Sequence, residues 1–160
     1  MRRLIAAAIA LMAFAATPAY ANWGDTRWGM TPEQVLKVIP FATPVTGAND
    51  IGGLRQMLSA QMTHEGFDGT AEFYFDPATR ALGAMRFKLE DPKQCAGYAT
   101  YLVGNFGEGE RTSETLRDGG TMITLKWGGF GGIDRYYFSE LTFDNGAAFM
   151  CVAMVKAPVK

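Results

Sequence analysis

Histidine is nearly absent from this sequence, since His64 is the only one among its 160 residues. The familiar zinc sites, which combine several histidine and cysteine ligands, are therefore excluded. Catalysis by a Ser-His-Asp or Cys-His arrangement would have to use His64, and no G-x-S-x-G motif supplies a nucleophilic serine. A lone histidine beside the end of a strand is typically a surface residue. We therefore predict that the protein is not an enzyme and needs no cofactor.

An excess of positive charge is also lacking, because the sequence has 15 lysine and arginine residues and 16 aspartate and glutamate residues. A mildly acidic chain without a basic run is poorly suited to bind nucleic acid or an anionic membrane surface. Beyond residue 21, no stretch approaches the ~20 apolar residues of a membrane span, and no cysteine stands where a lipid would be attached. The sequence predicts no nucleic-acid partner, no membrane span and no lipid anchor.

The N-terminal residues 1–21 have the pattern of a cleavable export signal. Two arginines precede an apolar stretch that is too short to span a bilayer, and an Ala-Tyr-Ala cleavage site follows. We predict cleavage after Ala21, so that the mature protein begins at Asn22 and is periplasmic. Residues 22–160 are an ordinary length for one domain with its own core.

Cys95 and Cys151 are the only cysteines, and both lie in the exported part. An even number of cysteines in an oxidising compartment favours a disulfide bond. A redox-active pair is usually C-x-x-C, whereas these two are far apart. The predicted Cys95–Cys151 bond closes a loop of about 55 residues and stabilises the fold by ~4 kcal/mol in the chain-entropy model.

Two helix starts share the order cap, proline, any residue, glutamine. In the first, Thr31 is the predicted N-cap, Pro32 the first helical residue and Gln34 the partner that completes a capping box. The second begins at Asp91, and an apolar stripe at helical spacing follows over residues 95–106.

Elsewhere the apolar residues alternate with polar ones, which predicts β-strands. In the hairpin over residues 71–89, we expect one face to be wet, with Glu72 and Asp76 facing exposed basic residues, Arg86 or Lys88. A turn signal at Asp144-Asn145-Gly146 predicts a second hairpin. The predicted strands are residues 71–76, 83–89, 121–127, 135–143 and 147–155, and residues 54–63 are either a strand or an irregular amphipathic segment.

The order of these elements predicts an α+β fold, in which two helices pack on one face of an antiparallel sheet. A helix followed by strands occurs twice along the chain. The pattern leaves open a tandem repeat of a helix-plus-strands unit, although the two halves share few residues.

The segment Gly29 to Val35 reads G-M-T-x-x-Q-V. It resembles the opening of the first helix in the small lipoprotein of the outer-membrane β-barrel assembly machinery. The order of elements is similar to that of the secreted β-lactamase inhibitor protein, whose halves are a tandem of the same unit. The resemblance covers residues 28–90 and implies a scaffold that binds other proteins without catalysis. Membrane anchoring is not implied, because this chain lacks the lipid-attachment cysteine.

A glycine-rich segment, Gly128-Gly129-Phe130-Gly131-Gly132, lies between two predicted strands. It lacks the lysine and the strand-to-helix context of a phosphate-binding loop. Phe130 on this flexible connection, with Trp127, Tyr136 and Tyr137 nearby, is a candidate protein-binding tip. The alternative is that these aromatic residues belong to the core.

Two further groups have weaker functional interpretations. Met57, Met62 and His64 are soft ligands that suit Cu(I), although methionine more often fills gaps in a core. Asp68, Glu72 and Asp76 contain paired carboxylates of the kind found in hydrolases, although their alternation favours a solvated strand face.

Taken together, these patterns predict a non-catalytic protein-binding module of the cell envelope, whose partner is another envelope protein. A secreted enzyme inhibitor is the first alternative. A small copper-binding or hydrolytic periplasmic protein is the second.

Overall fold

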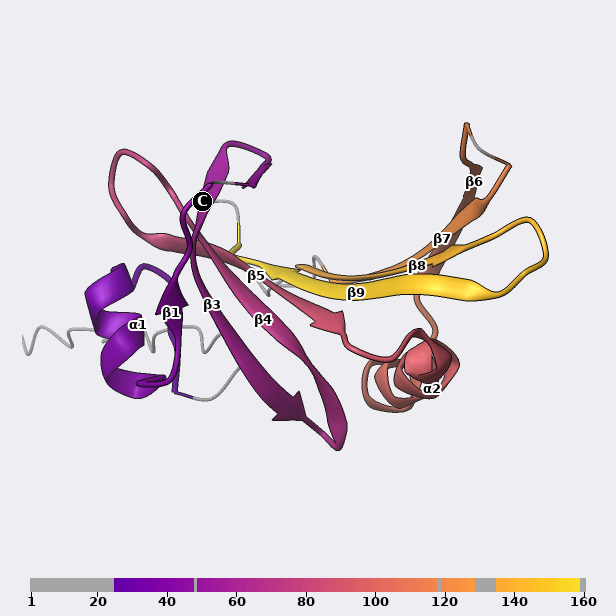
Figure 1. Ribbon diagram of the computed structural model, residues 1–160, viewed down its shortest axis with the longest axis horizontal. Helices are drawn as coiled ribbons and strands as arrows, with labels where there is room; N and C mark the ends of the chain where they lie inside the picture. The colour runs from indigo at the N-terminus through magenta and orange to yellow at the C-terminus, as the bar shows by residue number, and fades with distance from the viewer. Residues whose placement is uncertain (1–24, 48, 118, 129–134, 159–160) are drawn as a thin grey trace, which may run out of the picture.

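Nine strands form one antiparallel sheet within the residues that the computed structural model describes, which are 25–47, 49–117, 119–128 and 135–158. The strand order is β1-β3-β4-β5-β9-β8-β7-β6, with β2 also paired to β3. Two α-helices in these described ranges complete the α+β fold that the sequence predicts (Figure 1). The predicted signal at residues 1–21 and the predicted contact residue Phe130 lie outside the described residues.

The helices and strands follow one another along the chain as two helix-then-sheet blocks. The first block contains α1 (Pro32–Val38), β1 (Thr43–Pro44), β2 (Asp50–Ile51), β3 (Leu54–His64), β4 (Phe67–Phe75) and β5 (Leu82–Leu89). The second contains the short 3-10 helix η1 (Pro92–Gln94), α2 (Cys95–Phe106), β6 (Glu110–Thr115), β7 (Thr121–Trp127), β8 (Arg135–Thr142) and β9 (Ala148–Lys156). The blocks join where β9 pairs with β5.

Helix α1 begins with the capping box that the sequence predicts. The Thr31 hydroxyl accepts a hydrogen bond from the Gln34 backbone N–H, and the Gln34 side-chain oxygen accepts one from the Thr31 N–H. These reciprocal bonds satisfy two backbone donors that a helix N-terminus leaves without partners. The helix ends at Val38, two residues before Pro40.

The second helical segment begins at the predicted Asp91 cap and Pro92, although its first turn differs from that of α1. Asp91 accepts a hydrogen bond from the Lys93 backbone N–H, and the next turn is the 3-10 helix η1. Helix α2 starts only at Cys95, and no side-chain hydrogen bond caps it. The shared sequence pattern thus gives two different helix starts, since the Asp91 carboxylate accepts from the N–H two residues later and the Thr31 hydroxyl from the N–H three residues later.

The core lies on the face of the sheet that both helices cover, and Figure 1 shows the helices beneath its opposite ends. Directly paired residues share a face, so Met85 on β5 lies between Phe73 on β4 and Val155 on β9. Val35 of α1 and Tyr98 of α2 belong to the same buried cluster as these strand residues.

The disulfide between Cys95 and Cys151 is confirmed, with 5.8 Å between the two Cα atoms. It joins the first residue of α2 to the middle of β9. The bond therefore attaches the second helix covalently to the core face of the sheet.

The prediction that one face of the β4–β5 hairpin is exposed to solvent is wrong for the central part of that face. Tyr74 is fully buried there, and its hydroxyl donates a 2.8 Å hydrogen bond to the Glu72 carboxylate, which is itself 9% exposed. The Arg86 guanidinium donates to the same carboxylate and lies 5.5 Å from the centre of the Tyr74 ring. These polar groups can be buried because they form hydrogen bonds with one another. The alternation of polar and apolar residues in the sequence therefore does not show that this face is covered.

The remaining carboxylates and strands of this region also differ from the prediction. Asp76 does not face a base across the hairpin, and instead accepts hydrogen bonds from the backbone of Ala78 and Thr79. The strands β1, β2 and β6 were not predicted. The first two have two residues each, and β6 is exposed throughout, so none has the apolar alternation on which strand prediction depends.

Candidate binding cleft

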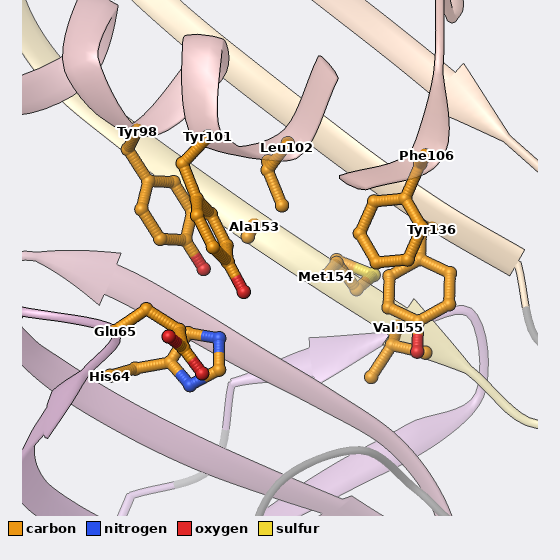
Figure 2. A pocket seen from close by; sticks show the side chains of 10 residues that line it. All are labelled: His64, Glu65, Tyr98, Tyr101, Leu102, Phe106, Tyr136, Ala153, Met154 and Val155. Atoms are coloured by element: carbon orange, nitrogen blue, oxygen red, sulfur yellow. The ribbon is translucent and has the colours of Figure 1, made fainter. Parts of the chain in front are cut away.

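A cleft of about 240 Å³ opens between α2, the turn that joins β3 to β4, and strands β8 and β9. Figure 2 shows that side chains from these three parts of the chain face one another across it. The ten described residues that line it are His64, Glu65, Tyr98, Tyr101, Leu102, Phe106, Tyr136, Ala153, Met154 and Val155.

One wall comes from the two-residue turn between β3 and β4. Glu65 and Gly66 form this turn, and both have positive φ angles, of 53° and 83°. Such turns favour asparagine, aspartate or glycine at the first position, because the left-handed conformation costs other residues ~1 kcal/mol. Glu65 occupies this strained position, and its carboxylate lies beside the His64 ring at the edge of the cleft (Figure 2).

His64 is half-buried among aromatic rings, so the expectation that it is a surface residue is wrong. Its ring centre lies 5.8 Å from that of Phe87, 6.3 Å from that of Tyr98 and 6.2 Å from that of Tyr101. Burial lowers the pKa of His64 below its ordinary value, against the opposing influence of Glu65. The imidazole is therefore neutral at pH 7.

A glycine on β4 allows this aromatic packing. A Cβ atom on Gly69 would lie 2.6 Å from the Phe87 ring and 2.5 Å from the Lys88 carbonyl oxygen. Only glycine therefore lets the Phe87 ring lie across β4, where it contacts both His64 and Tyr98.

The opposite wall is one side of α2, where Tyr98 and Tyr101 are three residues apart and so lie on the same side of the helix. Figure 2 shows both phenol oxygens pointing toward the turn that carries Glu65. Burial is the main cause that raises the pKa of each tyrosine, and the Glu65 charge adds to it. Both phenols thus stay protonated at neutral pH and present hydrogen-bond donors to the cleft.

The far end of the cleft is closed by a stacked pair, in which the rings of Phe106 and Tyr136 are 4.6 Å apart. Trp127 lies behind this pair, 6.2 Å from Phe106, and its indole N–H donates a 2.7 Å hydrogen bond to the Gly107 carbonyl oxygen. Trp127 is only 8% exposed, which indicates a structural role. Phe106 remains 39% exposed.

The structure brings together only part of the predicted aromatic binding group. Tyr136 lines the cleft beside Trp127, whereas Tyr137 is on the opposite face of the sheet, with the Lys156 ammonium 5.7 Å from its ring. Adjacent residues of a strand point to opposite faces, so Tyr136 and Tyr137 cannot belong to one surface. Phe130 lies outside the described residues.

Two of the predicted copper ligands are part of the packing around the core. Met57 lies at a bulge between Gln56 and Leu58, and both Met57 and Met62 pack against the buried core. The side chain of His64 is among the aromatic rings described above. In the described residues, no group of three or more histidine, cysteine, aspartate or glutamate side chains could hold a metal ion.

The three candidate hydrolase carboxylates have separate local partners. Asp68 accepts a hydrogen bond from the Thr63 hydroxyl, while Glu72 is paired with Arg86 and Asp76 holds a turn. No serine, threonine or cysteine is among the described residues that line the cleft. The arrangement thus offers hydrogen bonds, one charge and apolar surface to a ligand.

Sequence reasoning missed Glu65 and Tyr101 as site residues, and assigned Tyr98 and Phe106 only to a core stripe. One signal was available, because a Glu-Gly pair stands at the hairpin turn where Asn-Gly or Asp-Gly is usual.

Comparisons with protein-family models, with curated proteins and with solved structures find no match to this chain. The resemblance of the Gly29–Val35 segment to the assembly lipoprotein therefore stays a prediction. The capping box at Thr31 accounts for much of that segment by local physics alone.

Proposed function

We propose that this chain is a non-catalytic protein-binding module of the cell envelope, and that its cleft takes one side chain of a partner protein. The observation that supports this most is the cleft between α2 and the β3–β4 turn. Its volume of about 240 Å³ is below the roughly 300–1,000 Å³ of most small-molecule sites. A space of this size suits a single long side chain.

The walls of the cleft favour binding because they are held in place before a partner arrives. The disulfide fixes the start of α2, and the Phe106–Tyr136 stack closes the other end. A ligand then loses little free energy to ordering the site, which is the usual advantage of a preorganised pocket. Aromatic residues at such a rim are typical binding hot spots.

Export to an oxidising compartment is part of this proposal. The signal pattern in residues 1–21 supports it, and a disulfide is compatible with such a location. No helix in the described ranges is long and apolar enough to cross a membrane. Mass spectrometry of the protein from a periplasmic fraction is expected to give a chain that starts at Asn22 with both cysteines oxidised. An intact N-terminus in the cytoplasmic fraction would contradict export.

The partner contact is tested by site-specific crosslinking in the native envelope. A photoreactive phenylalanine analogue replaces Phe106, and in a matched control it replaces Phe143, which is 53% exposed and packs against Phe149. We expect one dominant envelope protein to be captured from position 106 and not from position 143. Equal capture from both positions, or none from position 106, would refute the cleft as the binding surface.

A substitution separates binding from folding in the same assay. Phe106→Ala is expected to reduce capture through an analogue at position 136 at least fivefold, because it removes one half of the ring stack. Phe143→Ala should leave that capture unchanged. If the captured protein is a hydrolase whose activity falls on binding, the module is an inhibitor of that enzyme.

A further inference from the structure

The charge of the cleft identifies the chemistry of its ligand. With His64 neutral, Glu65 is the one residue with a formal charge among the ten described residues that line the cleft. Four ion pairs join described residues elsewhere in the molecule, and Glu65 is in none of them. Its negative charge is therefore available to a ligand.

The surroundings of Glu65 also suit a positive charge. The rings and phenol oxygens of Tyr98 and Tyr101 face the carboxylate across the cleft (Figure 2). The faces of aromatic rings attract cations, and phenol oxygens accept hydrogen bonds from ammonium or guanidinium groups. The floor beyond them is apolar, formed by Leu102, Ala153 and Val155.

We infer that the cleft binds a cationic side chain, lysine or arginine, of the partner protein. Its charged end lies between Glu65 and the Tyr101 phenol, and its aliphatic stem covers the apolar floor. Long basic side chains commonly bury their stems in this way while the charged group stays near solvent. This inference rests on the proposed function, because it names the part of the partner that the cleft receives.

The strained turn gives this assignment independent support. Glu65 has a φ of 53°, a conformation in which asparagine or glycine would cost less. Residues that keep an unfavourable backbone conformation concentrate at functional sites. A glutamate at this position places a carboxylate at the edge of the cleft, which a glycine cannot do.

The test uses the mature, disulfide-bonded protein and three capped amino acids that differ in charge. Nα-acetyl-lysine N-methylamide is titrated and compared with the matching norleucine and glutamate compounds, with the backbone resonances of residues 64–66 and 98–106 followed by NMR. We expect the lysine compound to bind about fivefold more tightly than the norleucine compound, and the glutamate compound to bind most weakly.

A pair of variants shows whether Glu65 provides the preference. Glu65→Gln is expected to bring the affinity for the lysine compound down to that for norleucine. The control Glu33→Gln makes the same change of net charge on α1, at the other end of the sheet, and should leave the preference intact.

The outcomes distinguish this inference from the proposed function. Equal binding of the lysine and norleucine compounds, or an unchanged preference in Glu65→Gln, would overturn the cationic ligand and leave the cleft as a binding site. Absence of binding by all three compounds also overturns it, and the crosslinking at position 106 then decides the proposed function separately.

Discussion

The two helices cover the same face of the sheet, but α1 packs closely against the core whereas α2 borders a cleft. Helix α1 is sealed against the core, with Val35 fully buried and Ile39 only 5% exposed. Helix α2 buries Tyr98 and Leu102, yet it leaves a cleft beside Tyr101. Apolar burial holds the first helix, whereas a covalent bond supplements packing at the second. The cleft leaves apolar surface unburied, and the disulfide offsets the stability that this costs.

Removal of the disulfide is expected to have the largest effect on this difference. Because the bond spans 56 residues, the double variant Cys95→Ser/Cys151→Ser should lose ~4 kcal/mol of unfolding free energy, measured by urea denaturation. Amide hydrogen exchange should rise more in α2 than in α1. Equal loss of protection in both helices would mean that packing alone holds α2.

Truncation of one side chain on each helix tests the same comparison through packing. Val35→Ala is expected to cost ~2 kcal/mol, because it removes two buried methyl groups and leaves a cavity. Phe106→Ala should cost much less, because Phe106 is 39% exposed and borders a space that is already open. The urea midpoints of both variants provide the measurement, and a larger loss for Phe106→Ala would contradict the description of Phe106 as bordering an open cleft.

The two hairpin turns of the first block differ in a similar way. Glu65 and Arg80 both have positive φ, of 53° and 59°, so Glu65→Asn and Arg80→Asn should each relieve ~1 kcal/mol of backbone strain. Arg80→Asn also removes an exposed ion pair with Glu33, which contributes little. Only Glu65→Asn should weaken binding of the lysine compound. Thermal unfolding and the NMR titration check the two effects, and a loss of binding in Arg80→Asn would argue against a local role for Glu65.

The smallest expected effect is a dependence of stability on pH through His64. Its pKa is lowered in the folded state, so the unfolded chain binds a proton more readily as the pH falls below the ordinary value of 6.5. Stability is therefore expected to be complete above this pH and to fall as the pH is lowered through the folded-state pKa. His64→Gln should reduce the slope of unfolding free energy between pH 7 and about 5. An unchanged slope would show that burial of His64 has no energetic consequence.

Much of the fold follows from signals that are local in the sequence. The Thr31–Gln34 capping box and the turn at Asp144-Asn145-Gly146 appear where expected, since both depend on residues within a few positions of each other. The paired cysteines were also predictable, because an export signal and an even count suffice. The same local reasoning missed β6, which has no apolar pattern to detect.

The cleft could not be predicted in this way, because its walls come from segments that are distant in the sequence. Sequence alone determined the class of fold, the α1 cap and the pairing of Cys95 with Cys151. Tertiary structure decided that Tyr74 and Glu72 are buried and that Glu65 faces two tyrosines of α2. Alternation along a strand distinguishes its two faces, but what covers each face depends on how distant helices and turns pack against it.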